Sequence, residues 1–222
     1  VISASRNNTL KIPVDRIDRF KAAMAEHAAQ KRPFVSWQSH MLQPGESLAE
    51  IASRGGLTVP ALLRERVSRS ADRPLIARKQ KMGEVWRTIT AREFSEEVDA
   101  VASGLIGLGL EAGARVAIMS RTRYEWTLLD FACWTAALVP VPIYETSSSE
   151  QIAHVLTDAD VSLVVAETIT MAELARAAAA AAGREGTPVL SLDTDALHTI
   201  TDSGRSVPRS APAERTDSLT TS

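Results

Sequence analysis

The sequence predicts an α/β fold in which a mostly parallel β-α-β sheet is covered by helices. Short apolar runs rich in β-branched residues are typical of strands buried on both faces, and four occur, at residues 116–119, 139–143, 161–166 and 189–191. Helical patterns separate these runs, which gives the order β-α-β-α-β-α-β with parallel strands and right-handed crossovers. An N-terminal helical extension and a β-hairpin precede this alternation.

The composition is that of a soluble globular protein. The chain has 222 residues, of which 45% are hydrophobic and 23% charged, and its net charge is -2. These values suffice for a buried core and exclude general disorder. The near-neutral charge argues against nucleic acid as a partner, and no run approaches the roughly 20 apolar residues of a membrane span. Cys133 is the single cysteine, which excludes a disulfide framework and fits a cytoplasmic protein.

Three zones differ in character: an N-terminal extension (1–57), an α/β subdomain (58–192) and a polar tail (193–222). The extension holds one helical pattern over residues 14–30, whose apolar face is flanked by basic residues. Such a helix either lies on a membrane surface, giving peripheral membrane contact, or packs on the body of the protein. Acidic residues dilute its positive charge and favour packing. The tail, rich in Ser, Thr, Asp, Arg and Pro, predicts a loop or a frayed end.

The α/β subdomain begins with a helix and a hairpin. Thr58 caps the helix, which is expected to turn Leu62, Leu63 and Val67 inward. Two short strands around a polar turn follow, at residues 75–77 and 85–88.

Four later segments open with a hydroxyl residue and carry Glu three positions on. This is the capping box, in which the hydroxyl accepts one helix N–H and the carboxylate accepts another. The boxes predict four helix starts, at Thr90–Glu93, Thr122–Glu125, Ser147–Glu150 and Thr170–Glu173.

The helices and strands between these starts have distinct burial patterns. In the first helix Gly104 lies on the apolar stripe, where it allows close contact with a sheet. The second, residues 123–138, is apolar nearly all round and is expected to be buried on several sides. Pro140 and Pro142 remove hydrogen-bond donors from the strand at 139–143, which predicts either an edge position or a strand that is paired only in part.

Most motifs that carry chemistry are absent or misplaced. Residues 107–112 match the pattern G-x-G-x-x-A, but they end a helix instead of following a strand, so Gly109 is interpreted as a helix C-cap and Gly113 as a turn residue. No G-x-x-x-x-G-K-[ST] loop, H-E-x-x-H motif or G-x-S-x-G elbow occurs. Cys133 lies in the most apolar helix and is interpreted as a core residue.

Two strand-to-helix corners, residues 120–126 and 142–147, are expected at the carboxyl end of the sheet, where ligands gather in open α/β folds. Arg121 and Arg123 either hold an anion at the helix N-terminus or form ordinary ion pairs. Tyr144 either lines a pocket or packs.

At these corners the sequence resembles the N-terminal part of bacterial long-chain acyl-CoA synthetases, which belong to the AMP-forming, acyl-adenylate superfamily. The resemblance covers roughly residues 58–192, and the matching pieces lie at residues 85–90, 115–118, 122–126, 141–146 and 150–152. It implies a ligase of fatty-acid metabolism: a long-chain fatty acid attacks ATP, with Mg²⁺ assisting, to give acyl-AMP and pyrophosphate. Coenzyme A then displaces AMP to form the thioester.

The resemblance also implies what is missing. The family's phosphate loop, "YTSGTTGxPKG", is expected shortly after a segment like residues 215–221, and the sequence ends at Ser222. We therefore expect a fragment that has no catalytic residue, no metal ligand and no cofactor site of its own. In the full enzyme Tyr124, Trp126 and Tyr144 are candidates for substrate binding at the border of the acyl region, with packing as the alternative.

Two functions remain in competition. The chain is either the N-terminal piece of a long-chain fatty-acid CoA ligase, inactive alone, or a non-catalytic α/β interaction module derived from that family. A half-domain exposes apolar surface, so either a homo-oligomer or marginal solubility is expected.

Overall fold

The computed structural model describes residues 58–79, 86–208 and 210–213. The chain divides into two units after Glu46, and all of these residues belong to the second unit. The predictions made for residues 1–57, the helix at 14–30 included, lie outside the described residues.

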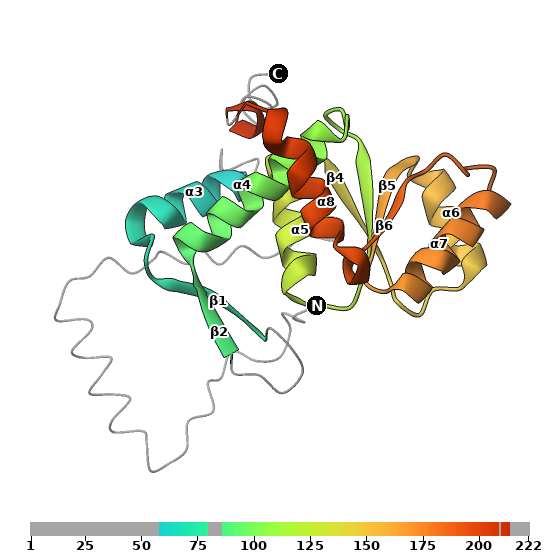
Figure 1. The fold of residues 1–222 in the computed structure, drawn as a ribbon, viewed down its shortest axis with the longest axis horizontal. Coiled ribbons are helices and arrows are strands. Elements are labelled where there is room, and N and C mark those ends of the chain that lie inside the picture. The colour runs from blue at the N-terminus through green and yellow to red at the C-terminus, as the bar shows by residue number, and fades with distance from the viewer. Residues whose placement is uncertain (1–57, 80–85, 209, 214–222) are drawn as a thin grey trace, which may run out of the picture. The chain divides into compact units, whose positions relative to one another are not determined.

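A parallel sheet with the strand order β4-β3-β5-β6 forms the centre of this unit (Figure 1). The predicted parallel α/β fold is confirmed, and β4 lies at an edge as its two prolines predict. The strands are β3 (Arg115–Met119), β4 (Val139–Ile143), β5 (Val161–Ala166) and β6 (Val189–Ser191); the helices that connect them are α5 (Tyr124–Thr135), α6 (Ser149–Asp158) and α7 (Ile169–Ala181).

Helices cover both faces of the sheet: α4 (Ala91–Gly107), α5 and α8 (Ala196–Ser203) pack on one, α6 and α7 on the other (Figure 1). In strand β3 a continuous apolar run places side chains in the cores on both faces of the sheet. Val116 and Ile118 join the core beneath α4 and α5, whereas Ala117 and Met119 join the core beneath α6 and α7. Each of these four side chains is at most 1% exposed, so removing any of them leaves a cavity.

The predicted first helix and hairpin are both present. Helix α3 (Val59–Ser70) begins after Thr58, whose hydroxyl accepts from the Ala61 N–H at 3.2 Å. Leu63 is buried as expected, but Leu62 is 45% exposed, so its inward placement is wrong. Strands β1 (Pro74–Lys79) and β2 (Trp86–Thr90) pair antiparallel in a small sheet of their own.

Of the four predicted capping boxes, the structure confirms one. Thr90 and Glu93 satisfy each other's backbone N–H at the start of α4. At α6 the box exists but lies one residue later, with Ser148 and Gln151 as partners. Helix α5 has no side-chain cap, and α7 is capped by Thr168, so the boxes at 122–125 and 170–173 are wrong. Several hydroxyls near a helix start compete for the same role, and spacing alone does not choose among them.

The expectation of a loop or frayed end after residue 192 is wrong for residues 196–203. These residues form α8, which packs on α4 and buries Ala196 and Ile200 in the main core. Two buried residues in an otherwise polar stretch give too weak a pattern to predict a helix. Tertiary contact with α4 supplies the stabilisation that the local sequence lacks.

Three glycines allow α8 and the turn after it to approach α4 closely. A Cβ on Gly104 would overlap the Ile200 carbonyl, and one on Gly107 would overlap the Ser203 carbonyl. From the other side, a Cβ on Gly204 would lie 2.6 Å from the Gly104 nitrogen. Gly104 therefore does make a close contact, but with helix α8 and not with the sheet as the sequence indicated.

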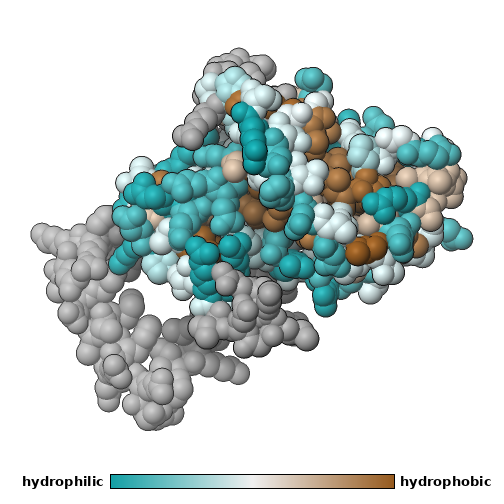
Figure 2. All heavy atoms as spheres, in the orientation of Figure 1, coloured by the Kyte–Doolittle hydropathy of each residue, from teal (hydrophilic) through white to brown (hydrophobic). Residues whose placement is uncertain are grey.

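Apolar surface remains exposed in the described part of the molecule. Figure 2 shows mainly hydrophilic residues over α3 and α4, and hydrophobic residues over the middle of the same face. The most exposed large apolar side chains include Trp86, Val139, Tyr144 and Ile169. Among the described residues, no helix has the length and apolarity that crossing a membrane requires.

Candidate functional site

The carboxyl ends of β3, β4 and β5 meet at one edge of the sheet because the strands are parallel. The two predicted corners, residues 120–126 and 142–147, therefore lie at the same edge, as expected. A third segment reaches this edge as well: Glu167 follows directly after β5. This is the position at which open α/β folds bind ligands.

Glu167 is the centre of the edge, and its side chain is only 3% exposed. Arg121 donates to it three ways, through Nη2 (2.6 Å) and Nε (3.2 Å) to Oε1, and through its backbone N–H to Oε2 (2.9 Å). The Ser120 hydroxyl lies 3.2 Å from Oε2, and Arg123 Nη1 lies 3.4 Å from Oε1. We call these four residues the Glu167 cluster; it ties the loop after β3 to the end of β5.

The cluster keeps Glu167 ionised. The pKa of Glu167 is lowered to about 2, mainly by hydrogen bonds from the Arg121 side chain. The Arg121 backbone N–H and the charge of its guanidinium lower this pKa further, whereas burial raises it. The hydrogen bond to Glu167 in turn raises the pKa of Arg121. A carboxylate with so low a pKa holds no proton at neutral pH and is a poor general base. The geometry is that of a fixed ionic bridge.

Both arginines of the corner already have carboxylate partners. Arg123 Nε donates to Glu125 at 2.6 Å in addition to its contact with Glu167. Of the two interpretations of this corner, ordinary ion pairs are therefore favoured over an anion site. Arg121 is 67% exposed and faces solvent on its outer side, so water screens its remaining charge.

Tyr124, a candidate for substrate binding, is buried against α4 and β1. Its hydroxyl donates to Glu97 Oε2 at 2.7 Å, and the Arg78 guanidinium lies 4.6 Å from the centre of its ring. Phe94 packs edge-on against the same ring at 6.1 Å. Burial, and then the Glu97 carboxylate, raise the pKa of the Tyr124 hydroxyl. Tyr124 thus joins three elements of the fold.

The other two candidates lie in different surroundings. Trp126, in the first turn of α5, is half-buried against the core, and Tyr144 is 80% exposed beyond the end of β4. Within the described residues, no ring contact joins Tyr124, Trp126 and Tyr144. Their role in substrate binding stays a prediction.

Sequence reasoning missed Glu167. The available signal was one acidic residue placed directly after the apolar run 161–166, at the same edge as two arginines. Its partners come from 44 to 47 residues earlier in the chain, so only the strand order β3-β5 identifies them.

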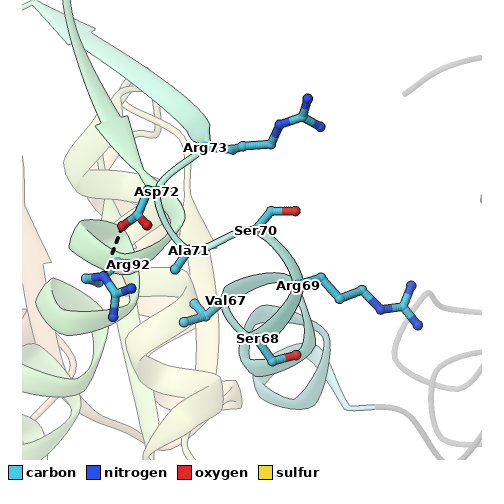
Figure 3. Close-up of a pocket in the computed structure, with 8 residues that line it drawn as sticks. All are labelled: Val67, Ser68, Arg69, Ser70, Ala71, Asp72, Arg73 and Arg92. Atoms are coloured by element: carbon cyan, nitrogen blue, oxygen red, sulfur yellow. Dashed lines mark hydrogen bonds and ion pairs between the residues drawn. The ribbon is translucent and has the colours of Figure 1, made fainter.

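Two cavities lie away from this edge. One, of about 800 Å³, opens at the end of α3 (Figure 3), where Arg92 donates to Asp72 at 3.2 Å and Arg69 pairs with Glu65. Figure 3 shows Arg69 and Arg73 pointing out from the pocket. The other, of about 660 Å³, lies between α4, α8 and the turn Gly204–Ser206. Both are open and polar, and neither includes a residue of the Glu167 cluster.

Among the described residues, no group of three or more His, Cys, Asp or Glu is placed to hold a metal ion. The arginines at the sheet edge are already ion-paired. Cys133 is buried in the core, as predicted, and burial raises the pKa of its thiol.

An open parallel sheet with helices on both faces places this unit in the class of doubly wound α/β domains. Residues 63–220 match the family model described as AMP-binding enzyme. The chain belongs to this family.

Known relatives indicate which members of this family the chain resembles. Over 137 residues the chain is 42% identical to the long-chain-fatty-acid–CoA ligase FadD15 of Mycobacterium bovis and to FadD15 of Mycobacterium tuberculosis. This match covers 61% of the chain but only 22% of each relative, so the chain spans about a fifth of the length of these proteins. The ligase ACSBG2 of Mus musculus is 30% identical over 136 residues, 59% of this chain and 20% of that protein.

Solved structures confirm the fold. The N-terminal subdomain of NpsA from Klebsiella oxytoca is 26% identical, with a TM-score of 0.51 over 65% of this chain and 32% of that one. A long-chain-fatty-acid–CoA ligase, FadD1 of Archaeoglobus fulgidus, is 20% identical, with a TM-score of 0.57 over 66% of this chain and 30% of that one. At this identity the second likeness concerns the fold alone.

Proposed function

We propose that this chain serves as the N-terminal α/β subdomain of an AMP-forming long-chain fatty-acid–CoA ligase. The identity of 42% over 137 residues to the FadD15 ligases carries the proposal. The proposed overall reaction converts a long-chain fatty acid, ATP and coenzyme A into acyl-CoA, AMP and pyrophosphate through an acyl-adenylate, with Mg²⁺ on the nucleotide.

Within that reaction the chain's role is to build and hold the sheet edge. The Glu167 cluster fixes the loop 120–123 at the carboxyl ends of the strands, where the substrate is proposed to approach. The carboxylate at the centre of this edge, Glu167, is ionised and paired with Arg121 and Arg123, and the Cys133 thiol is buried in the core. We therefore propose that the 222-residue chain alone has no ligase activity, and that Trp126 and Tyr144 face the acyl chain only in a complete enzyme.

A chimera tests the ligase proposal. The segment of M. tuberculosis FadD15 that matches this chain is replaced by this chain's own 137 residues, and palmitoyl-CoA formation is measured. We expect the chimera to retain activity, since the two segments are 42% identical over these 137 residues. A chimera that folds, as judged by circular dichroism and gel filtration, but makes no palmitoyl-CoA contradicts the proposal and favours the non-catalytic interaction module.

The inactivity of the chain alone is tested separately. The purified 222-residue chain is incubated with ATP, Mg²⁺, palmitate and coenzyme A, and AMP is measured. We expect no AMP above a heat-denatured control. AMP release that depends on palmitate contradicts this part of the proposal without affecting the first.

Location and assembly complete the proposal: a cytoplasmic protein with peripheral membrane contact that forms homo-oligomers. The basic residues that flank the apolar face of the pattern at 14–30 support membrane contact, whereas its acidic residues favour packing on the protein. Exposed apolar side chains such as Val139 and Ile169 support association. Flotation with anionic vesicles tests membrane contact by comparing the chain with a variant that lacks residues 14–30, and equal vesicle binding by the two contradicts it. Light scattering tests oligomerisation, and a monomer at every concentration contradicts it.

A further inference from the structure

Strand β4 is an apolar strand at an edge of the sheet that the described residues form. Its sequence, VPVPI, has no polar residue, and Val139 is 47% exposed. Among the described residues, no strand lies on its outer side. An apolar edge strand of this kind is normally a template for pairing with another chain, and proteins block such edges with charges, bulges or prolines.

The register of β4 determines which main-chain groups face outward. The Val139 N–H donates to the Ala114 carbonyl at 2.9 Å, and β4 pairs with β3 residue for residue from there to Ile143. In a parallel ladder alternate residues direct both their N–H and their C=O to the same neighbour. Val139, Val141 and Ile143 therefore face β3, and positions 140 and 142 face the open edge.

Both outward positions are proline. A proline has no N–H, so the outer edge of β4 presents carbonyl acceptors and no matching donors at these positions. The two prolines remove no hydrogen bond between β4 and β3, because every residue of β4 that faces β3 keeps its N–H. This explains how a strand with two prolines in five residues remains part of the sheet.

We propose that Pro140 and Pro142 close the outer edge of β4 to main-chain pairing with a second copy of this chain. When two copies of β4 are laid antiparallel about Val141, position 140 of each copy lies opposite position 142 of the other. Each such pair exchanges two N–H···O=C bonds, and all four donors would come from prolines. Two copies can still associate through side-chain contacts, but they cannot extend the sheet from edge to edge through β4.

The test restores the missing donors. The double variant Pro140→Thr with Pro142→Thr places an N–H at both outward positions. Threonine favours strands and is more polar than proline in surface contacts, so new association does not come from added apolar area. The control is Pro188→Thr: the Pro188 carbonyl accepts from Val164 at 2.9 Å, so position 188 faces β5 and its new N–H points inward.

Mass is measured by light scattering over a dilution series, and main-chain protection by amide hydrogen exchange. We expect the double variant to reach at least twice the parent's mass at high concentration, with the new amides at positions 140 and 142 protected there. The control is expected to keep the parent's mass. Oligomers in which these two amides exchange freely overturn the proposal, as does a folded double variant whose mass always equals that of the parent.

A second variant covers the case in which the double variant does not fold. Pro142→Thr alone changes an exposed side chain and supplies half of the donors. If this variant is folded and its mass rises with concentration, the proposal holds; an unchanged mass overturns it. Parent oligomers whose residues 139–143 gain main-chain protection on association overturn it as well.

Discussion

The α4–α8 contact and the Glu167 cluster both join segments that lie far apart in the sequence, but they do so by opposite means. At the first, three glycines remove side chains so that backbones meet. At the second, a buried carboxylate gathers donors from two arginines and a serine. The first contact depends on shape and tolerates no added atom, whereas the second depends on charge and responds to pH.

The largest expected effect is at the glycine contact. Gly104→Ala places a methyl group on the Ile200 carbonyl, so α8 must move away from α4. We expect the free energy of unfolding to fall by about 3 kcal/mol, the upper range for an overpacked core, although alanine favours a helix. Urea denaturation measures it. Gly186, with open space around it, is the control: Gly186→Ala is expected to change stability by less than about 0.5 kcal/mol.

Removing the carboxylate comes next. Glu167→Ala leaves the Arg121 backbone N–H and the Ser120 hydroxyl without this acceptor. Arg121 is largely exposed and regains water, which limits the loss. We expect a destabilisation of about 2 kcal/mol, the size of one strong hydrogen bond to a charged group. Arg92→Ala, which breaks an exposed pair with Asp72, is the matched control and is expected to change stability little. Equal losses in the two variants contradict a special role for Glu167.

The pH dependence sharpens the comparison. The folded pKa of Glu167, about 2, lies below its ordinary value of 4.5, so the stabilisation is complete above pH 4.5 and is lost as pH falls toward 2. Glu167→Gln keeps the shape but not the charge, and we expect it to cost about 1 kcal/mol near neutral pH. The difference between parent and variant is expected to shrink across that window. A difference that is constant with pH shows that the charge is irrelevant.

The smallest effect is expected at Tyr124. Tyr124→Phe keeps the ring contact with Phe94 and loses the hydrogen bond to Glu97, which retains Arg78 at 3.5 Å. We expect a loss of about 0.5 kcal/mol in thermal or urea unfolding. Tyr144→Phe, at a side chain that is 80% exposed, serves as the control and is expected to have no measurable effect. A larger loss at Tyr144 than at Tyr124 contradicts the packing described.

Sequence patterns predicted the sheet better than its connections. The continuous apolar run of β3 predicts burial on both faces, because Val116 and Ala117 supply opposite cores, and the prolines of β4 predict an edge. Helix α8 and the Glu167 cluster were not predictable in this way. Ile200 is buried only because Gly104 lets α8 approach, and Glu167 is paired only because β5 lies beside β3. Both depend on tertiary neighbours more than 40 residues away in the sequence.

The central claim is that the buried carboxylate of Glu167 holds the carboxyl edge of this sheet together and stays ionised around neutral pH. Carboxyl-carbon NMR of the folded chain, with Glu167 assigned by comparison with Glu167→Gln, tests it most directly. The account predicts that the Glu167 resonance begins to titrate only far below pH 4.5, with a pKa of about 2. A midpoint at or above 4.5 would contradict it and would make Glu167 a candidate for proton transfer.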